Sequence, residues 1–296
     1  MFGVRFMKFF FVVVVLVMMP TSFTELLLAD GQDQGPLFFV GFSGSYFDPG
    51  WQFKLDATGG YQFNRHFEIT AGLPVYFIRP PDDTTEEGTT QQTGIGDLYF
   101  DLRGTASYSS LFFSSSVRVA APTGDKDEGF STGKVTYDWN NYIEYSLGNW
   151  TPFGSAGIAN TISDTHFLTR PFSSFGFVGQ FEGGLLFDPT VWIGFGASGY
   201  AVVPNGDQQI FYRHSGQGGP RSEGMGNGRR WFYEEAVYEV TDAENLRDHG
   251  FSAWLDVYPI PNVALEFGYS RSVSYEYNTL FFSTHFDLAG MIRKDR

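Results

Sequence analysis

Cysteine is absent from this chain of 296 residues, basic residues are scarce, and no long apolar run follows the first twenty residues. The absence of cysteine excludes disulfides, thiolate metal sites and a cysteine nucleophile. Nineteen Lys and Arg stand against 33 Asp and Glu, which gives a net charge of −14. Because phosphate binding needs clustered Lys and Arg, this balance argues against a nucleic-acid partner. A spanning helix needs about 20 apolar residues, so we expect no transmembrane helix in the mature chain.

The N-terminus has the pattern of a secretory signal peptide. Arg5 and Lys8 supply positive charge ahead of an apolar run over 9–19, and Ala29 offers a small residue for cleavage. We therefore expect residues 1–29 to be removed and residues 30–296 to form the mature domain. The alternative is an uncleaved membrane anchor, although Pro20 interrupts the run before it reaches spanning length.

Aromatic residues make up 19% of the chain, yet its mean hydropathy is only −0.16. The large apolar residues alternate with polar ones, which is the periodicity of a strand whose two faces meet different surroundings. Over 51–63, for example, apolar or small residues fill the odd positions, and polar residues or glycine fill the even ones. The same pattern predicts twelve strands, at 37–47, 51–63, 67–78, 95–104, 111–121, 135–147, 150–160, 175–187, 191–203, 251–259, 263–273 and 279–289.

The connections between these strands alternate in length. Short turns follow the even-numbered strands, as at 64–66 and 148–149, whereas several long polar segments follow the odd-numbered ones, as at 79–94 and 204–250. This rhythm is typical of an outer-membrane barrel with short periplasmic turns and longer extracellular loops. We therefore predict an all-β, closed, antiparallel up-and-down transmembrane barrel in a bacterial outer membrane. The alternative is a soluble sandwich or lipocalin-like barrel, but twelve strands would enclose too wide an interior for side chains to fill.

If the apolar face meets lipid, the opposite face lines the lumen and carries ten acidic residues against three basic ones. Such an interior would repel anions and admit cations or neutral solutes. The alternative is a plugged, ion-paired interior with a structural role only. The residues expected on this face are Asp56, Glu68, Asp97, Asp101, Asp138, Glu144, Glu182, Asp256, Glu266 and Asp287, with the bases Lys54, Arg103 and Arg118.

The longest connection, 204–250, is rich in glycine and is flanked by aromatic residues that are too apolar for a freely solvated loop. We expect it to fold over or into the barrel mouth as a constriction or binding lid, unless it is a partly disordered surface loop. The glycine-rich stretch lacks the Gly-Lys-Ser/Thr ending of a phosphate loop. The aromatic residues proposed for the constriction are Phe211, Tyr212, Trp231, Phe232 and Tyr233.

Catalytic chemistry is poorly represented in the sequence. Ser283, His285 and Asp287 share one strand face, but such neighbours lie about 7 Å apart, too far for the direct hydrogen bonds of a catalytic triad. We therefore predict no enzymatic activity, no catalytic residue, no cofactor and no metal site. A lipid-modifying enzyme acting through Ser283 and His285 and a non-conducting structural or adhesion barrel are the two alternatives to a channel.

Two short motifs resemble a known family. They are Gly94-Ile95-Gly96-Asp97-Leu98 and, some twenty residues later, Pro122-Thr123-Gly124-Asp125. Both are similar to motifs in the outer-membrane barrels named after the MetA pathway of phenol degradation, and the likeness is best over 94–200. The resemblance implies an outer-membrane transporter or channel for small organic compounds, often aromatic or hydrophobic. The expected partners are then outer-membrane lipid, a small-molecule solute and the outer-membrane assembly machinery.

Overall fold

The computed structural model describes residues 34–47, 50–79, 92–162, 164, 172–212, 239–241, 246–260, 262–276 and 278–287. The expected signal peptide, residues 1–29, lies outside this part of the chain, as do Trp231, Phe232 and Tyr233. Within the described residues no helix is long and apolar enough to cross a membrane. Nearly all of the regular structure is β-strand.

Fourteen strands belong to one sheet. Their bounds are β1 Gly35–Phe47, β2 Gly50–Asn64, β3 Phe67–Arg79, β4 Gln92–Ile95, β5 Leu98–Tyr108, β6 Leu111–Ala121, β7 Thr136–Tyr145, β8 Trp150–Ala159, β9 Phe172–Phe187, β10 Ile193–Tyr212, β11 Glu239–Thr241, β12 Asp248–Ile260, β13 Val263–Ser272 and β14 Asn278–Asp287.

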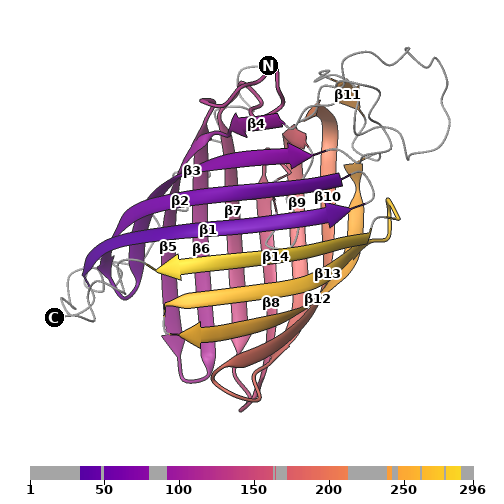
Figure 1. Ribbon diagram of the computed structural model, residues 1–296. Helices are drawn as coiled ribbons and strands as arrows, with labels where there is room; N and C mark the ends of the chain where they lie inside the picture. Colours follow the sequence, from indigo (N-terminus) through magenta and orange to yellow (C-terminus); the bar gives the residue numbers. More distant parts are fainter. Residues whose placement is uncertain are drawn as a thin grey trace, which may run out of the picture.

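The sheet closes on itself. Each strand pairs antiparallel with its neighbours, and the last strand, β14, pairs with the first, β1, so that the indigo and yellow ribbons lie side by side in Figure 1. Strands β4 and β5 both pair with β3 and form one interrupted wall strand, whereas β11 pairs with the far end of β10 as an extra strand. The ring therefore contains twelve strands, and the predicted closed antiparallel barrel is confirmed.

Several predicted bounds were wrong, mostly near the long loops. The strand expected at 191–203 continues to Tyr212, and the strand expected to start at 251 starts at Asp248, so the 204–250 connection is shorter than predicted. The strand at 95–104 begins earlier, breaks at residues 96–97 and continues to Tyr108. The extension of β10 forms because β9 and β10 keep pairing beyond a bulge between Asn205 and Gln209.

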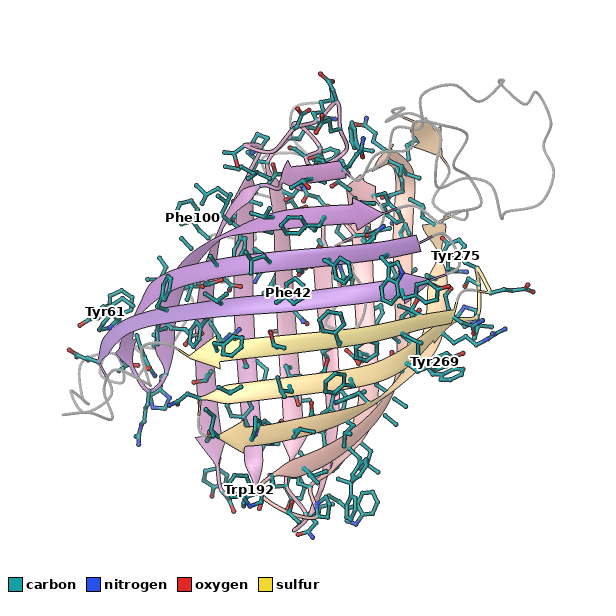
Figure 2. All side chains as sticks on the ribbon, viewed as in Figure 1. Phe42, Tyr61, Phe100, Trp192, Tyr269 and Tyr275 are labelled. Carbon is teal, nitrogen blue, oxygen red and sulfur yellow. The ribbon has the colours of Figure 1, made fainter. Side chains whose placement is uncertain are left out.

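The two faces of the wall differ as the alternation predicts. On β5, Phe100 is 50% exposed, whereas the next residue, Asp101, is only 7% exposed. Figure 2 shows Phe100 and Tyr61 projecting outward from the wall. A closed barrel with an apolar outer face is the form in which strands can cross lipid, because no backbone group is left unpaired. The protein is therefore a transmembrane barrel of a bacterial outer membrane.

Paired aromatic rings mark both rims of this outer face. The rings of Tyr46 and Trp51 lie 4.6 Å apart at the end of the barrel that carries the long loops. Those of Trp150 and Phe187 lie 4.3 Å apart at the end with the short turns. Tyr and Trp favour the two membrane interfaces, because their rings are apolar and their polar atoms reach water. We call the two ends extracellular and periplasmic, following the usual placement of long loops and short turns.

Candidate pore constriction

The described start of the connection after β8, residues 160–162 and 164, turns into the barrel toward the opposite wall. Its first residue, Asn160, accepts the Tyr137 N–H at 2.7 Å, and Ile162 donates its N–H to Ser174 Oγ at 2.6 Å. Two residues later, the Asp164 carboxylate reaches strands β2 and β3. Strand β2 lies five strands from β8 in the order β2-β3-β5-β6-β7-β8, which is nearly opposite in a ring of twelve. Asp164 therefore bridges the lumen.

The bridge consists of one ion pair and one hydrogen bond. Asp164 Oδ2 lies 3.4 Å from Lys54 Nζ, and it accepts the Tyr76 hydroxyl at 2.9 Å. The Asp164 side chain is only 9% exposed, so its charge is largely removed from water, and these two partners help to stabilise it.

A second polar group lies on β2, β5 and β6, next to the bridge. The Tyr99 hydroxyl donates to Asp56 Oδ1 at 2.9 Å and lies 2.9 Å from Thr58 Oγ1. The Arg118 guanidinium lies 4.1 Å from the centre of the Tyr99 ring, and its Nε and Nη2 donate to Asp101 Oδ2 at 3.2 and 2.9 Å. About half of the Arg118 side chain remains exposed, so its charge faces open space inside the barrel.

These two groups surround a cavity of about 130 Å³. We call them together the constriction. It combines cationic, anionic and phenolic groups in a narrow space, which can select solutes by size, charge and hydrogen bonding. Its polar members are Lys54, Asp56, Tyr76, Tyr99, Asp101, Arg118 and Asp164.

The structure divides the predicted lumen residues between the two ends of the barrel. Asp56 and Asp101 belong to the constriction, and Asp97 beside it accepts the Gly124 N–H at 3.0 Å. Asp138 is the register partner of Arg118 on β7. Toward the periplasmic end, Glu68 pairs with Arg103 at 3.2 Å.

Four further predicted carboxylates, on β7, β9, β12 and β13, have a neutral donor or neighbour on their own or the adjacent strand. The Tyr142 hydroxyl donates to Glu144 at 2.7 Å, Trp254 Nε1 donates to Asp256 at 3.1 Å, and Ser283 Oγ donates to Glu266 at 3.4 Å. The fourth, Glu182, lies opposite Tyr200 in the β9–β10 register. Asp287 ends β14, and its side chain lies outside the described residues.

Sequence reasoning missed three members of the constriction. Tyr76 and Tyr99 could have been found, because strand alternation places Tyr99 on the same face as Asp97 and Asp101. Asp164 carries no such signal, since it lies in a connection where no periodicity indicates direction.

The role of Phe211 and Tyr212 in an aromatic constriction stays a prediction, although the structure places both residues on a strand instead of a loop. Phe211 and Tyr212 belong to β10, where they pair with Ser173 and Phe172 of β9. Phe211 is buried, and the Lys126 ammonium lies 5.7 Å from its ring centre. These residues form wall and mouth contacts, because β10 continues past the point where the sequence predicts a loop.

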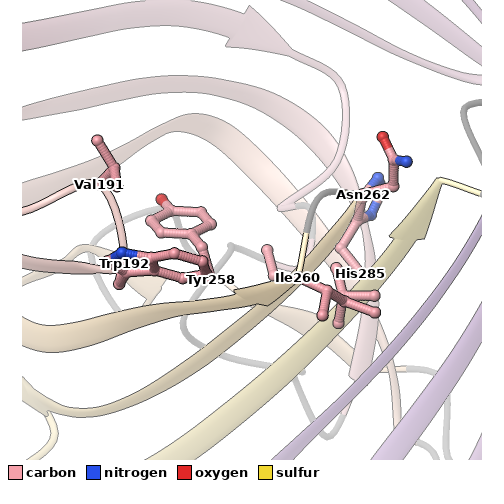
Figure 3. A pocket seen from close by; sticks show the side chains of 8 residues that line it. Val191, Trp192, Tyr258, Ile260, Asn262 and His285 are labelled. Atoms are coloured by element: carbon pink, nitrogen blue, oxygen red, sulfur yellow. The ribbon is translucent and has the colours of Figure 1, made fainter.

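A larger cavity of about 500 Å³ opens at the periplasmic end (Figure 3). Trp192 from the β9–β10 turn and Tyr258 from β12 lie together on one side of it, and Ile260 and His285 lie on the other. The His285 ring packs 5.0 Å from the ring of Phe39. This vestibule is mainly aromatic and apolar, which suits contact with organic solutes.

Among the residues that the structure describes, no three or more His, Asp or Glu side chains lie close enough together to hold a metal ion. The loop acid Asp125 is used locally, because its Oδ1 accepts the N–H groups of Asp127 and Glu128 at 2.8 and 3.2 Å.

No protein-family model matches the chain, so the motif resemblance to the phenol-degradation barrels stays a prediction. Among solved structures, an outer membrane channel from Pseudomonas putida F1 is similar at 11% identity, with 86% of this chain and 98% of that chain covered and a TM-score of 0.48. The NanC porin is 7% identical, with 84% of this chain and 100% of the porin covered and a TM-score of 0.46. The Pseudomonas putida toluene transporter TodX is 11% identical, with 88% of this chain and 91% of the transporter covered and a TM-score of 0.40.

Proposed function

We propose that this protein is an outer-membrane channel for small organic solutes. The proposal rests on the solvent exposure of charged side chains on the inner wall of the barrel. The side chains of Arg103 and Arg118 are 50% and 47% exposed, although both form ion pairs. Charged groups half open to solvent inside a closed barrel indicate a hydrated interior rather than a packed core.

The charge of this interior favours cations and neutral solutes over anions. Lys54, Arg103 and Arg118 each pair with a carboxylate, so they add little net positive charge. The carboxylates Glu144 and Asp256 accept hydrogen bonds from Tyr142 and Trp254, which carry no charge. A lumen with a net negative wall lowers the local concentration of anions and raises that of cations.

Aromatic surface supports an organic solute. The periplasmic vestibule contains Trp192 and Tyr258. Higher in the lumen, the rings of Tyr142 and Phe153 lie 5.8 Å apart, and Phe153 lies 6.3 Å from Trp254. Exposed rings such as Trp192 and Tyr258 offer weak, repeated contacts, which let an apolar solute bind and leave again, whereas Trp254 is buried in a packed cluster with Phe281. The two motifs that resemble the phenol-degradation barrels favour the same class of solute.

Planar-bilayer recording tests the proposal. Folded protein, identified by its heat-modifiable gel mobility, should give discrete conductance steps and a reversal potential that favours cations over anions. Vesicles containing the protein should take up small neutral aromatic solutes faster than empty vesicles. Absence of both conductance and solute flux from folded protein would refute the channel.

The ion pairs of the constriction also favour a second candidate function. The protein would then be a non-conducting barrel whose loops bind partners. In that case the Asp164→Ala variant would remain electrically silent, because removal of the bridge would expose no continuous path. A channel predicts instead that the Asp164→Ala conductance is at least as high as that of the native protein.

A further inference from the structure

We propose that Phe130, on the connection between β6 and β7, is a positioning residue for the constriction and acts through Tyr76 on Asp164. The inference rests on the proposed channel function and assigns a role to the two motifs that the sequence shares with the phenol-degradation barrels. It concerns residues 122–135, all of which the structure describes.

The two motifs contact each other. Leu98 donates its N–H to Thr123 Oγ1 at 2.8 Å, and Gly124 donates its N–H to Asp97 Oδ1 at 3.0 Å. A side chain at Gly124 would collide with backbone, because its Cβ would lie 2.7 Å from the Ile95 carbonyl oxygen. The motifs thus form a latch that holds the start of the β6–β7 connection against the break between β4 and β5.

The latch directs the connection into the barrel mouth. Past the latch, Asp125 accepts the Phe130 N–H at 2.8 Å through its backbone oxygen, which closes a compact turn. On the far side, Ser173 Oγ donates to the Gly129 oxygen at 3.0 Å. The connection is therefore fixed to β9 as well as to the β4–β5 break, and it spans part of the extracellular mouth.

Phe130 is the apolar anchor of this connection. It is 2% exposed and forms a buried cluster with Tyr76 and Ile78 of β3. Its ring lies over Gly94, where any Cβ would overlap it. The first glycine of the Gly94-Ile95-Gly96 motif thus provides the space for the Phe130 ring.

Tyr76 connects this anchor to the bridge. Its ring stacks on Phe130, with centroids 6.0 Å apart and planes 26° from parallel. Gly96, the second glycine of the motif, leaves room for the other side of the ring, since a Cβ there would lie 2.7 Å from Tyr76 Cε2. Confined between these neighbours, the Tyr76 hydroxyl is aimed at Asp164 Oδ2, 2.9 Å away, and Asp164 in turn pairs with Lys54.

Phe130 also borders the 130 Å³ cavity, so its truncation could widen the path through lost bulk alone. The Tyr76→Phe variant separates the two effects, because it keeps the ring and removes only the hydroxyl that holds Asp164. If Phe130 acts through Tyr76 on Asp164, then Phe130→Ala and Tyr76→Phe should shift the reversal potential in the same direction, and neither change should shift it further in an Asp164→Asn protein.

The decisive experiment is a double-variant comparison in planar bilayers. The Phe130→Ala/Tyr76→Phe protein should show no larger shift in reversal potential than Phe130→Ala alone, because both changes release the same carboxylate. Phe130→Tyr, which keeps an aromatic ring, should restore much of the native value. Phe100→Ala, an equal truncation on the outer face of β5, is the matched control and should leave the reversal potential unchanged.

Each outcome is informative. Additive shifts, or a native reversal potential in Tyr76→Phe, would overturn the positioning role while leaving the channel intact. If Phe130→Ala fails to fold by gel mobility, Phe130→Leu takes its place in the same comparison, and Tyr76→Phe with and without Asp164→Asn tests the second half of the pathway. No conductance from any folded variant would overturn the channel and this inference together.

Discussion

Replacing Arg118 by Gln removes one positive charge from the constriction and keeps a polar side chain in its place. In the native protein the guanidinium binds Asp101 through two N–H groups and lies over the Tyr99 ring. The Gln amide can still donate to Asp101, which keeps a negative charge after the substitution. We therefore expect Arg118→Gln to increase the preference of the channel for cations over anions.

The size of this change follows from the exposure of the guanidinium. Because 47% of the Arg118 side chain is exposed, a permeating ion meets its charge across water. A unit charge at roughly 4–8 Å in water interacts by about 0.5–1 kcal/mol. A cation gains this amount and an anion loses it, so the difference is about 1–2 kcal/mol. The ratio of cation to anion permeability should then rise about 5- to 30-fold.

The assay is the reversal potential across a planar bilayer that separates unequal KCl concentrations. It is best measured below about 0.1 M salt, where the screening length exceeds about 10 Å. Arg65→Gln is the matched control, since it removes the same charge from the exposed β2–β3 turn. Arg118→Gln/Asp101→Asn removes both charges and should return the ratio toward the native value.

An unchanged reversal potential in folded Arg118→Gln would refute the assignment of this residue to the conduction path. An equal change in Arg65→Gln would refute it as well, because the effect would then come from surface charge. Loss of folding is not expected, since the Gln amide can still donate to Asp101, whose side chain is only 9% exposed and would otherwise lose its donor.

Three further outcomes follow from the packing. Gly196→Val should destabilise the barrel by about 1–3 kcal/mol, because its Cβ would overlap the Trp254 ring, and the loss appears as a lower unfolding temperature on heat-modifiable gels. Phe267→Arg should lower the yield of folding into lipid vesicles, because Phe267 is half exposed on the outer face. An Arg side chain at the bilayer midplane costs about 2–4 kcal/mol. The control, Phe267→Leu, should fold normally. Asp97→Ala should speed proteolysis within 122–135, because it removes the acceptor of the Gly124 N–H, whereas Asp97→Asn should preserve protection.

The strand pattern was readable because each wall strand has lipid on one face and polar surroundings on the other. In β2 the exposed residues Trp51, Leu55 and Tyr61 all fall on the face that alternation predicts as apolar. The short turns were readable for a related reason, since they leave few residues between two clear alternating runs. The predicted strand bounds were wrong where a strand continues beyond the membrane, as β10 does. Its residues there no longer alternate between apolar and polar, because neither face meets lipid.

The charged side chains were predicted as a lumen lining, but their partners were not. Lys54 alternates with apolar residues on β2, which indicates its face and nothing about Asp164. That pairing joins residues 110 positions apart through a connection that crosses the lumen. Nothing local to either residue encodes such a contact.

The sequence by itself determined the strand count of the ring and the closed antiparallel architecture, because period-two alternation reports the two different surroundings of each wall strand. Only the tertiary structure decided how the mouth is built. The motifs at 94–98 and 122–125 are short strings until folding brings them together as a latch. The insertion of Phe130 and the bridge through Asp164 then depend on which connections fit inside the closed ring, and that is a property of the whole barrel.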